Sequence, residues 1–225
     1  YRSDLAFNCT GARDGGNGTR IVAFGMDGEA LMLTLYGADG SRAFRVKWLL
    51  CELGVEFDHE PSRPHSPKIV ALNPLGQVPV LTDNDLVLTD SIAILHYLAD
   101  RAGQFTYGPG TPERAVMDAR INFVLTEMEA ASGLLAKPGF VLPAAARHPG
   151  MRAVAEPDFA RGEARFATLL GEAEFIAGDE FTVADIVAGQ TLGWARAAKI
   201  PLQSQLTKDY LARLSARPGF VKAQG

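Results

Sequence analysis

The segment Asn73-Pro74-Leu75-Gly76-Gln77-Val78-Pro79-Val80-Leu81 decides how the first half of the chain is interpreted. Asn-Pro and the glycine after it are typical of a turn, and the apolar run that follows predicts a strand. Because proline lacks a backbone N–H, Pro79 marks an edge or a special position of that strand. A proline after such a turn is a candidate for a cis peptide bond, which would leave the Val78 main chain free to pair with an extended ligand. An ordinary trans proline at a strand start is the alternative.

On both sides of this segment, the spacing of apolar residues predicts a compact α/β unit over residues 32–103. Upstream, the pattern predicts a strand over 33–36, a helix over 41–53 that Gly54 ends, a strand over 55–60 and a short helix from Ser66. Downstream, a turn at 83–85 leads into a strand over 86–88, and Thr89-Asp90-Ser91 begins a helix that ends at Gly103. The predicted order is βαβαββα.

The second half of the chain is predicted to be all-helical. After a linker over 104–111, residues 112–225 form this domain, with helices over 112 to about 136, 151–173, 183–197 and 208–216 and a proline-broken loop over 137–150. Residues 1–31 contain no hydrophobic region of the kind found in signal peptides. We expect them to be a disordered leader outside the fold.

Composition excludes several classes of function. The chain has 225 residues with 22 Lys+Arg and 26 Asp+Glu, which is not the basic footprint of a nucleic-acid-binding or membrane-surface protein. No apolar run approaches the roughly 18 residues of a membrane-spanning helix. The two cysteines exclude a disulfide scaffold, and His59 and His148 have no partners at metal-ligand spacing. We therefore expect a cytoplasmic protein with no metal and no nucleic-acid or membrane partner.

Asp90 and Ser91 form the second candidate feature. A helix N-terminus carries partial positive charge and unpaired N–H groups, so it can hold a carboxylate. The Ser91 hydroxyl would add a donor, and the Asp90 carboxylate could hold an ammonium group beside it. Together they suit the two charges of an amino-acid head group. Plain helix capping is the alternative.

Ser41 is the third candidate feature. It lies at a predicted helix N-terminus, close in sequence to Tyr36, Asp39 and Arg42, where the thiol of a ligand could be stabilised. A capping role alone would explain Ser41 equally well.

The three features occur in a characteristic order. Leu35-Tyr36-Gly37 precedes Ser41-Arg42, the segment 73–81 follows, and Thr89-Asp90-Ser91-Ile92-Ala93-Ile94 comes third. In this order they resemble a cytosolic glutathione S-transferase of bacterial type. Phe181-Thr182-Val183-Ala184-Asp185-Ile186 resembles the capping box and hydrophobic staple of that family's second domain. The resemblance implies a thioredoxin-like N-terminal domain followed by an all-helical domain.

The resemblance also implies roles for individual residues. Val78 would pair with the cysteinyl backbone of glutathione, Pro79 would be cis, and Asp90 and Ser91 would hold the γ-glutamyl end.

Three further residues match binding positions of the family. Gln77 and, more weakly, His65 would approach the glycyl end of glutathione, and Asp118 would reach the glutathione of a partner subunit. A homodimer is therefore implied.

The activating groups of the family depart from its pattern. The hydroxyl of the serine-type branches is replaced by Ala38, and the cysteine of the bacterial branch is replaced by Ser41. The His-Lys pair of that bacterial branch is Glu129-Ala130 here. Ser41 is therefore the first candidate for thiol activation and Tyr36 the second.

We predict a glutathione transferase, with glutathione as co-substrate and a small hydrophobic electrophile held mainly by the helical domain. Two alternatives remain open. The same site could carry out glutathione-dependent reduction of peroxides or disulfides. The chain could also be a non-catalytic glutathione-binding or protein-interaction module, which the presence of Ala38 would favour.

Overall fold

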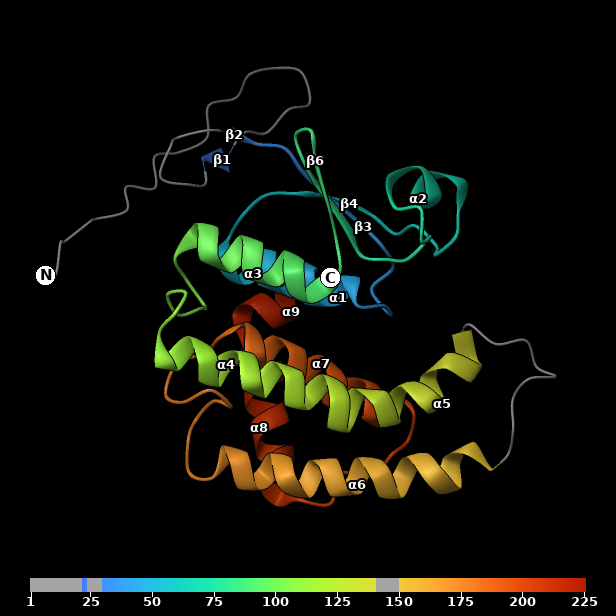
Figure 1. The fold of residues 1–225 in the computed structure, drawn as a ribbon, viewed down its shortest axis with the longest axis vertical. Helices are drawn as coiled ribbons and strands as arrows, with labels where there is room; N and C mark the ends of the chain where they lie inside the picture. Colours follow the sequence, from blue (N-terminus) through green and yellow to red (C-terminus); the bar gives the residue numbers. More distant parts are fainter. Residues whose placement is uncertain (1–21, 24–29, 141–149) are drawn as a thin grey trace, which may run out of the picture.

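The computed structural model describes residues 22–23, 30–140 and 150–225. Its first half contains a four-stranded sheet and three helices in the predicted order βαβαββα (Figure 1). These elements are β3 (Leu33–Tyr36), α1 (Ala43–Leu53), β4 (Asp58–Glu60), α2 (Pro67–Leu72), β5 (Val80–Asp83), β6 (Leu86–Thr89) and α3 (Ser91–Ala102). The predicted thioredoxin-like fold is confirmed.

The strands lie in the order β4-β3-β5-β6. β3 and β4 are parallel, whereas β5 runs antiparallel to both β3 and β6. Buried Leu33 and Leu35 alternate with half-buried Thr34 and Tyr36, as expected where successive side chains point to opposite faces. The leucine face belongs to the main hydrophobic core, which also includes residues of α1 and α3.

Helices α1 and α3 lie between the sheet and the helices of the second half (Figure 1). Both end at the predicted glycines, Gly54 and Gly103, whose φ angles are 67° and 62°. Glycine adopts this left-handed conformation without a steric penalty, which explains why both helices stop there.

The second half is all-helical where it is described, as predicted. Its helices are α4 (Pro112–Phe123), the π-helical segment η1 (Val124–Glu129), α5 (Ala130–Phe140), α6 (Met151–Leu170), α7 (Val183–Ala197), α8 (Gln205–Ser215) and α9 (Pro218–Gln224). The predicted capping box at the start of α7 is present, since Asp185 accepts from the Thr182 N–H at 2.8 Å and Thr182 accepts from the Ala184 N–H. Tyr210 of α8 donates to the Asp185 carboxylate at 2.7 Å and links the two helices.

Aromatic side chains join α1 to the C-terminal part of the chain. The Trp48 ring lies 4.8 Å from that of Phe220 in α9 and 5.9 Å from that of Phe181. Arg217 donates to the Glu52 carboxylate at 2.8 Å across the same contact. The second half therefore packs directly on α1, the helix that follows β3.

Several boundaries differ from the expectations. The helix predicted to end near residue 136 continues to Phe140 through η1, and α9 lies beyond the last predicted helix, which was expected to end at residue 216. Proline is acceptable there because it occupies the first turn of α9, where an N–H would lack a helical partner. The strand predicted over 55–60 is shorter and begins at Asp58.

The predicted leader contains one small paired element. β1 (Val22–Ala23) pairs antiparallel with β2 (Ala30–Leu31), within the segment 1–31 that was expected to be a disordered leader. The other leader residues, 1–21 and 24–29, lie outside the described part of the chain.

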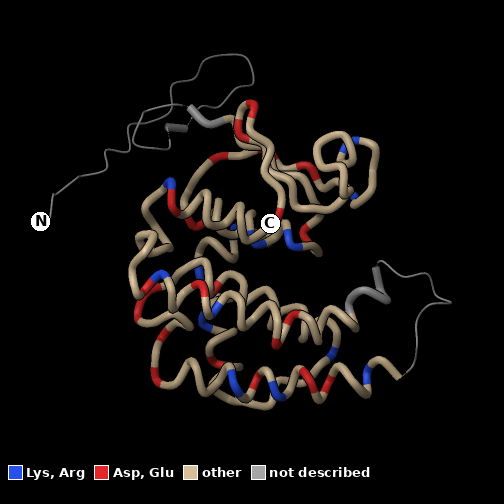
Figure 2. The backbone as a smooth tube through the Cα atoms, in the orientation of Figure 1, with Lys and Arg blue, Asp and Glu red and all other residues tan. Residues whose placement is uncertain are grey.

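Charges of both signs are scattered over the two halves, for instance along α6 (Figure 2). Among the described residues, no helix combines the length and the apolar character needed to cross a membrane.

Candidate functional site

The loop before α1 and the turn before β5 meet at Gly37, the residue directly after β3. A Cβ atom placed on Gly37 would lie 2.7 Å from the Ala43 Cβ, 3.1 Å from the Val78 Cβ and 3.5 Å from the Ser41 Oγ. The first of these distances is shorter than a real Cβ contact, and Gly37 has a φ of 134°, so glycine is needed here. The structure thus brings Ser41 and Val78 together, as the sequence predicted for two sides of one ligand site.

The Val78–Pro79 peptide bond is cis, as the resemblance implied. β5 begins only at Val80, and among the described residues no backbone hydrogen bond is formed by the Val78 N–H or C=O. Asn73 stabilises this turn, because its side chain donates to the Gln77 C=O at 3.0 Å. A main-chain donor and acceptor are therefore available beside Gly37.

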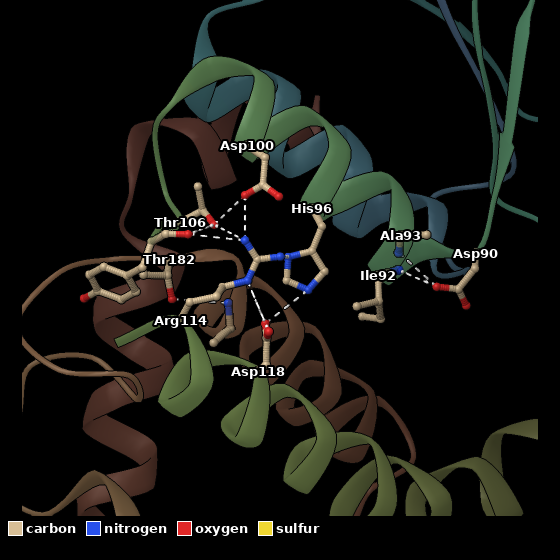
Figure 3. A network of polar contacts seen from close by, with 11 residues as sticks. Asp90, Ile92, Ala93, His96, Asp100, Thr106, Arg114, Asp118 and Thr182 are labelled. Atoms are coloured by element: carbon tan, nitrogen blue, oxygen red, sulfur yellow. Dashed lines mark hydrogen bonds and ion pairs between the residues drawn. The ribbon is translucent and has the colours of Figure 1, made fainter. Parts of the chain in front are cut away.

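Asp90 and Ser91 begin α3, where Figure 3 shows the Asp90 carboxylate. Its Oδ1 accepts from the Ile92 N–H at 2.8 Å and from the Ala93 N–H at 3.1 Å, so the capping role is real. Asp90 is exposed, and the other carboxylate oxygen remains available to a ligand. The Ser91 side chain is buried and accepts from the Arg45 guanidinium at 3.3 Å.

The Ser41 hydroxyl faces the first turn of α1. It donates to the Ala38 C=O at 2.6 Å and accepts from the Ala43 N–H at 3.1 Å, so α1 begins at Ala43, two residues after the predicted start. The Ser41 C=O accepts from the Gln190 side chain of α7 at 2.7 Å. This contact fixes the loop to the second half of the chain.

Tyr36, the second candidate for thiol activation, lies elsewhere. Its side chain follows buried Leu35 and therefore points to the opposite face of the sheet from the leucines. There the Lys68 ammonium of α2 lies 5.3 Å from the centre of the tyrosine ring. The role of Tyr36 toward a thiol stays a prediction.

Gln77 and His65 lie at the outer edge of the same region, and both are exposed. The backbone N–H of His65 donates to the Gly76 C=O at 2.8 Å. A Cβ on Gly76 would lie only 2.2 Å from the His65 Nδ1, so the imidazole covers the residue beside Gln77. His65 thus lies against Gly76, Gln77 directly precedes Val78 in the chain, and the role of both residues toward a ligand stays a prediction.

Asp118 lies away from these turns, in the network that Figure 3 shows between α3 and α4. Its carboxylate accepts from Arg114 at 3.1 Å and lies 3.4 Å from the His96 Nε2. Arg114 also bonds to Asp100 at 2.8 Å and to the His96 Nδ1 at 2.9 Å. Burial and the neighbouring Arg114 charge hold the pKa of His96 below its ordinary value. The proposed contact of Asp118 with a partner subunit stays a prediction.

Sequence reasoning missed a cluster of charges at the boundary between the two halves. Arg45 of α1 is fully buried and forms an ion pair with Glu129, which is 4% exposed and ends η1. Arg42 pairs with the same carboxylate, with its Nε 2.7 Å from Oε1. Thr191 of α7 accepts from Arg45 at 3.3 Å. The sequence signal that could have predicted this cluster was Arg45, a charged residue on the apolar side of α1, three positions before Trp48.

The electrostatics of this cluster favour the charged form of the Glu129 carboxylate. Burial alone would raise the pKa of Glu129, but the charges of Arg45 and Arg42 outweigh it and hold that pKa below its ordinary value. Burial also lowers the pKa of Arg45, and Glu129 opposes this shift. An arginine remains protonated throughout the physiological range, so two cations share one carboxylate.

The described residues contain no group of three or more His, Cys, Asp or Glu side chains that could hold a metal ion.

Comparisons with known proteins agree with this geometry. Residues 31–100 match the family model for the glutathione S-transferase N-terminal domain, and residues 128–220 match the model for the C-terminal domain. The chain is 31% identical over 206 residues to glutathione S-transferase 3 of Zea mays, covering 84% of this chain and 92% of that protein. It is 27% identical over 187 residues to a stringent starvation protein A homolog of Pasteurella multocida, covering 80% and 84% of the two chains.

A solved structure shows the same overall fold with ligand present. It is the theta class glutathione S-transferase of the citrus canker pathogen Xanthomonas axonopodis pv. citri with glutathione bound. The TM-score is 0.74 and the identity 26%, over 86% of this chain and 97% of that one.

Proposed function

The chain belongs to the glutathione S-transferase family, and on that premise we propose that it conjugates the thiolate of glutathione to small hydrophobic electrophiles. The observation that carries this proposal is the convergence at Gly37 of the Ser41 hydroxyl and the Val78 turn. The exposed carboxylate of Asp90 adds a second anchor at the start of α3.

Each part of this site suits one part of glutathione. The Val78 N–H and C=O can pair with the cysteinyl backbone in the manner of an added strand. The start of α3 supplies partial positive charge for the γ-glutamyl carboxylate, and the Asp90 carboxylate can accept from the ammonium group. Gln77 and His65, which are exposed beside Gly76, are the residues that we assign to the glycyl end.

Activation of the thiol is the demanding step. A thiol with a pKa of about 8.5 is only about 3% thiolate at pH 7, and a decrease of about two pKa units requires roughly 2.7 kcal/mol of differential stabilisation. We assign part of this stabilisation to Ser41, whose hydroxyl can turn from the Ala38 C=O to donate to sulfur. The amides in the first turn of α1 add to it. The thiolate then attacks an electrophilic carbon of a substrate held between this turn and the helical domain.

The test is a comparison of the wild type with Ser41→Ala. We expect the pKa of the bound thiol, followed by the ultraviolet absorbance of the thiolate, to rise by about one unit in the variant, and conjugation of an aryl halide at pH 7 to fall about threefold with the thiolate fraction. Ser215→Ala is the matched control, since Ser215 also donates to a backbone C=O, that of Leu211, but at the end of α8. An unchanged thiol pKa and rate in Ser41→Ala would reject the role of Ser41.

A second function is favoured by one observation. The Ser41 hydroxyl already donates to the Ala38 C=O at 2.6 Å, which suits a glutathione-binding module without turnover. Retention on immobilised glutathione, with no turnover of aryl halides, hydroperoxides or mixed disulfides, would select this function. Turnover of hydroperoxides or mixed disulfides alone would select a peroxidase or disulfide reductase that uses the same site.

We also propose a homodimer in which Asp118 approaches the partner's glutathione site. Asp118 is 40% exposed although it pairs with Arg114, so one side of the carboxylate faces outward. Sedimentation velocity tests the dimer, and Asp118→Asn should weaken glutathione binding without changing the mass of the assembly. A monomer at all accessible protein concentrations would contradict this assignment.

A further inference from the structure

We propose that Arg42 is a specificity-determining residue of the electrophile site and that this site favours electrophiles bearing an anionic group such as a carboxylate. This inference rests on the proposed function, because it concerns the second substrate of the same reaction. It is carried by the cluster of Arg42, Arg45, Glu129 and Trp194, which none of the expected roles used.

The position of Arg42 is held on two sides. Its Nε donates to the Glu129 Oε1 at 2.7 Å, and its Nη2 lies 2.5 Å from the same oxygen. Its guanidinium carbon lies 5.5 Å from the centre of the Trp194 ring. A guanidinium between a carboxylate and an aromatic face keeps a defined orientation, so it can recognise a ligand without first becoming ordered.

The cluster retains positive charge. Glu129 is shared with Arg45, which is fully buried and already forms an ion pair with the other carboxylate oxygen. Two guanidinium groups and one carboxylate sum to one net positive charge. Since Arg45 is closed to solvent and the Arg42 side chain is 47% exposed, Arg42 is the member that can offer this charge to a ligand.

Arg42 also has donors to offer. Its Nε and Nη2 face Glu129, and within the described parts of the chain its Nη1 makes no hydrogen bond. A planar guanidinium with a free edge suits a carboxylate better than a neutral group.

The location connects this charge with the reaction. Arg42 directly follows Ser41, whose C=O is held by Gln190 of α7, and Trp194 lies one turn further along that helix. The same helix therefore positions the loop proposed to activate the thiol and the guanidinium beside it. An anionic group on the electrophile would be bound while its reactive carbon approaches the sulfur.

The experiment compares two matched ligand pairs in wild type and Arg42→Gln. Binding of unreactive 3,5-dinitrobenzoate and 1,3-dinitrobenzene is measured calorimetrically at saturating glutathione, and turnover is measured with 4-chloro-3,5-dinitrobenzoate and 2-chloro-1,3-dinitrobenzene. Within each pair the compounds differ by the carboxylate. We expect the preference for the carboxylate, in binding and in kcat/KM, to fall about tenfold in Arg42→Gln, and Arg42→Lys to retain part of it.

Two controls separate specificity from folding and from net charge. Arg45 continues to pair with Glu129 in Arg42→Gln, so the variant should melt like the wild type. Arg196→Gln removes the same charge from an exposed position of α7 and should leave the preference unchanged. An unchanged preference in Arg42→Gln would overturn the inference. Absence of turnover with both halides would instead count against the proposed function, and the binding pair would still decide the role of Arg42.

Discussion

Arg45 of α1 and Glu129 of η1 form an ion pair whose two side chains are 0% and 4% exposed, between elements 84 residues apart in the chain. Both are stabilised by neighbours, since Arg45 also bonds to Ser91 and Thr191 and Glu129 also accepts from Arg42. The pair connects the start of α3, where we place the γ-glutamyl end of glutathione, to the helical half of the molecule.

Removal of Glu129 should be costly. Glu129→Ala leaves the buried Arg45 charge uncompensated, and we expect the free energy of unfolding to fall by about 3–5 kcal/mol. Urea denaturation of Glu129→Ala, Arg45→Met and the double variant gives the coupling energy. The double variant should lose less than the sum of the single variants, because no unpaired charge remains. Additive losses would contradict a strong interaction.

Asp90 combines a cap with a negative charge, and two substitutions separate these roles. Asp90→Asn keeps an acceptor for the Ile92 and Ala93 N–H groups and tolerates the φ of 72°, so stability should change by less than about 0.5 kcal/mol. Asp90→Ala loses the cap and should cost about 1 kcal/mol.

Both Asp90 variants should bind glutathione about tenfold more weakly, because each loses a charged acceptor for the ammonium group. Isothermal calorimetry checks this. Wild-type affinity in Asp90→Asn would show that the carboxylate serves only as a cap.

Gly162 allows α6 to approach η1. A Cβ at this position would lie 2.5 Å from the Glu127 C=O oxygen, which is backbone and cannot move aside easily. Gly162→Ala should therefore destabilise the protein by about 1–3 kcal/mol, although alanine is normally better than glycine in a helix. Gly193→Ala in α7 meets nothing within 4 Å and should stabilise by up to about 1 kcal/mol. Thermal denaturation of both variants tests the opposite signs.

His96 makes stability depend on pH. Burial and Arg114 lower its pKa from 6.5, and the nearby Asp118 and Asp100 only partly offset them. The folded state thus binds this proton less readily than the unfolded state, so the stabilising contribution is present above about pH 6.5 and is lost as the pH falls. Melting temperatures should decrease more steeply between pH 7.5 and 5.5 in the wild type than in His96→Asn. Parallel curves would show that His96 titrates as it does in the unfolded chain.

Local patterns predicted much of the fold. The glycines that end α1 and α3, the capping box at Thr182 and the hairpin of β5 and β6 are all confirmed. Each depends on residues a few positions apart, whose geometry follows from helix and turn stereochemistry. The π-helical segment η1 was not predicted, because a widened turn has no distinctive residue pattern and is stabilised by what packs around it.

The candidate site also contains residues that local motifs predicted and relationships that only the folded structure shows. Sequence alone proposed Ser41, Val78 and the start of α3 as site residues, because their motifs are short and require particular residue types. It left Tyr36 and Ser41 as alternatives for thiol activation, and only the folded sheet shows that Tyr36 packs against Lys68 on the face away from the leucines.

The sequence by itself thus determined the family, the βαβαββα order and the turns that we propose as the glutathione site. The tertiary structure decided which charges lie together. Arg42 and Glu129 are 87 residues apart, and no local periodicity relates them. Packing α7 and η1 against α1 removes Arg45 from water. A buried guanidinium is stable only beside a carboxylate, so the fold places Glu129 next to Arg45, and Arg42 pairs with the same carboxylate.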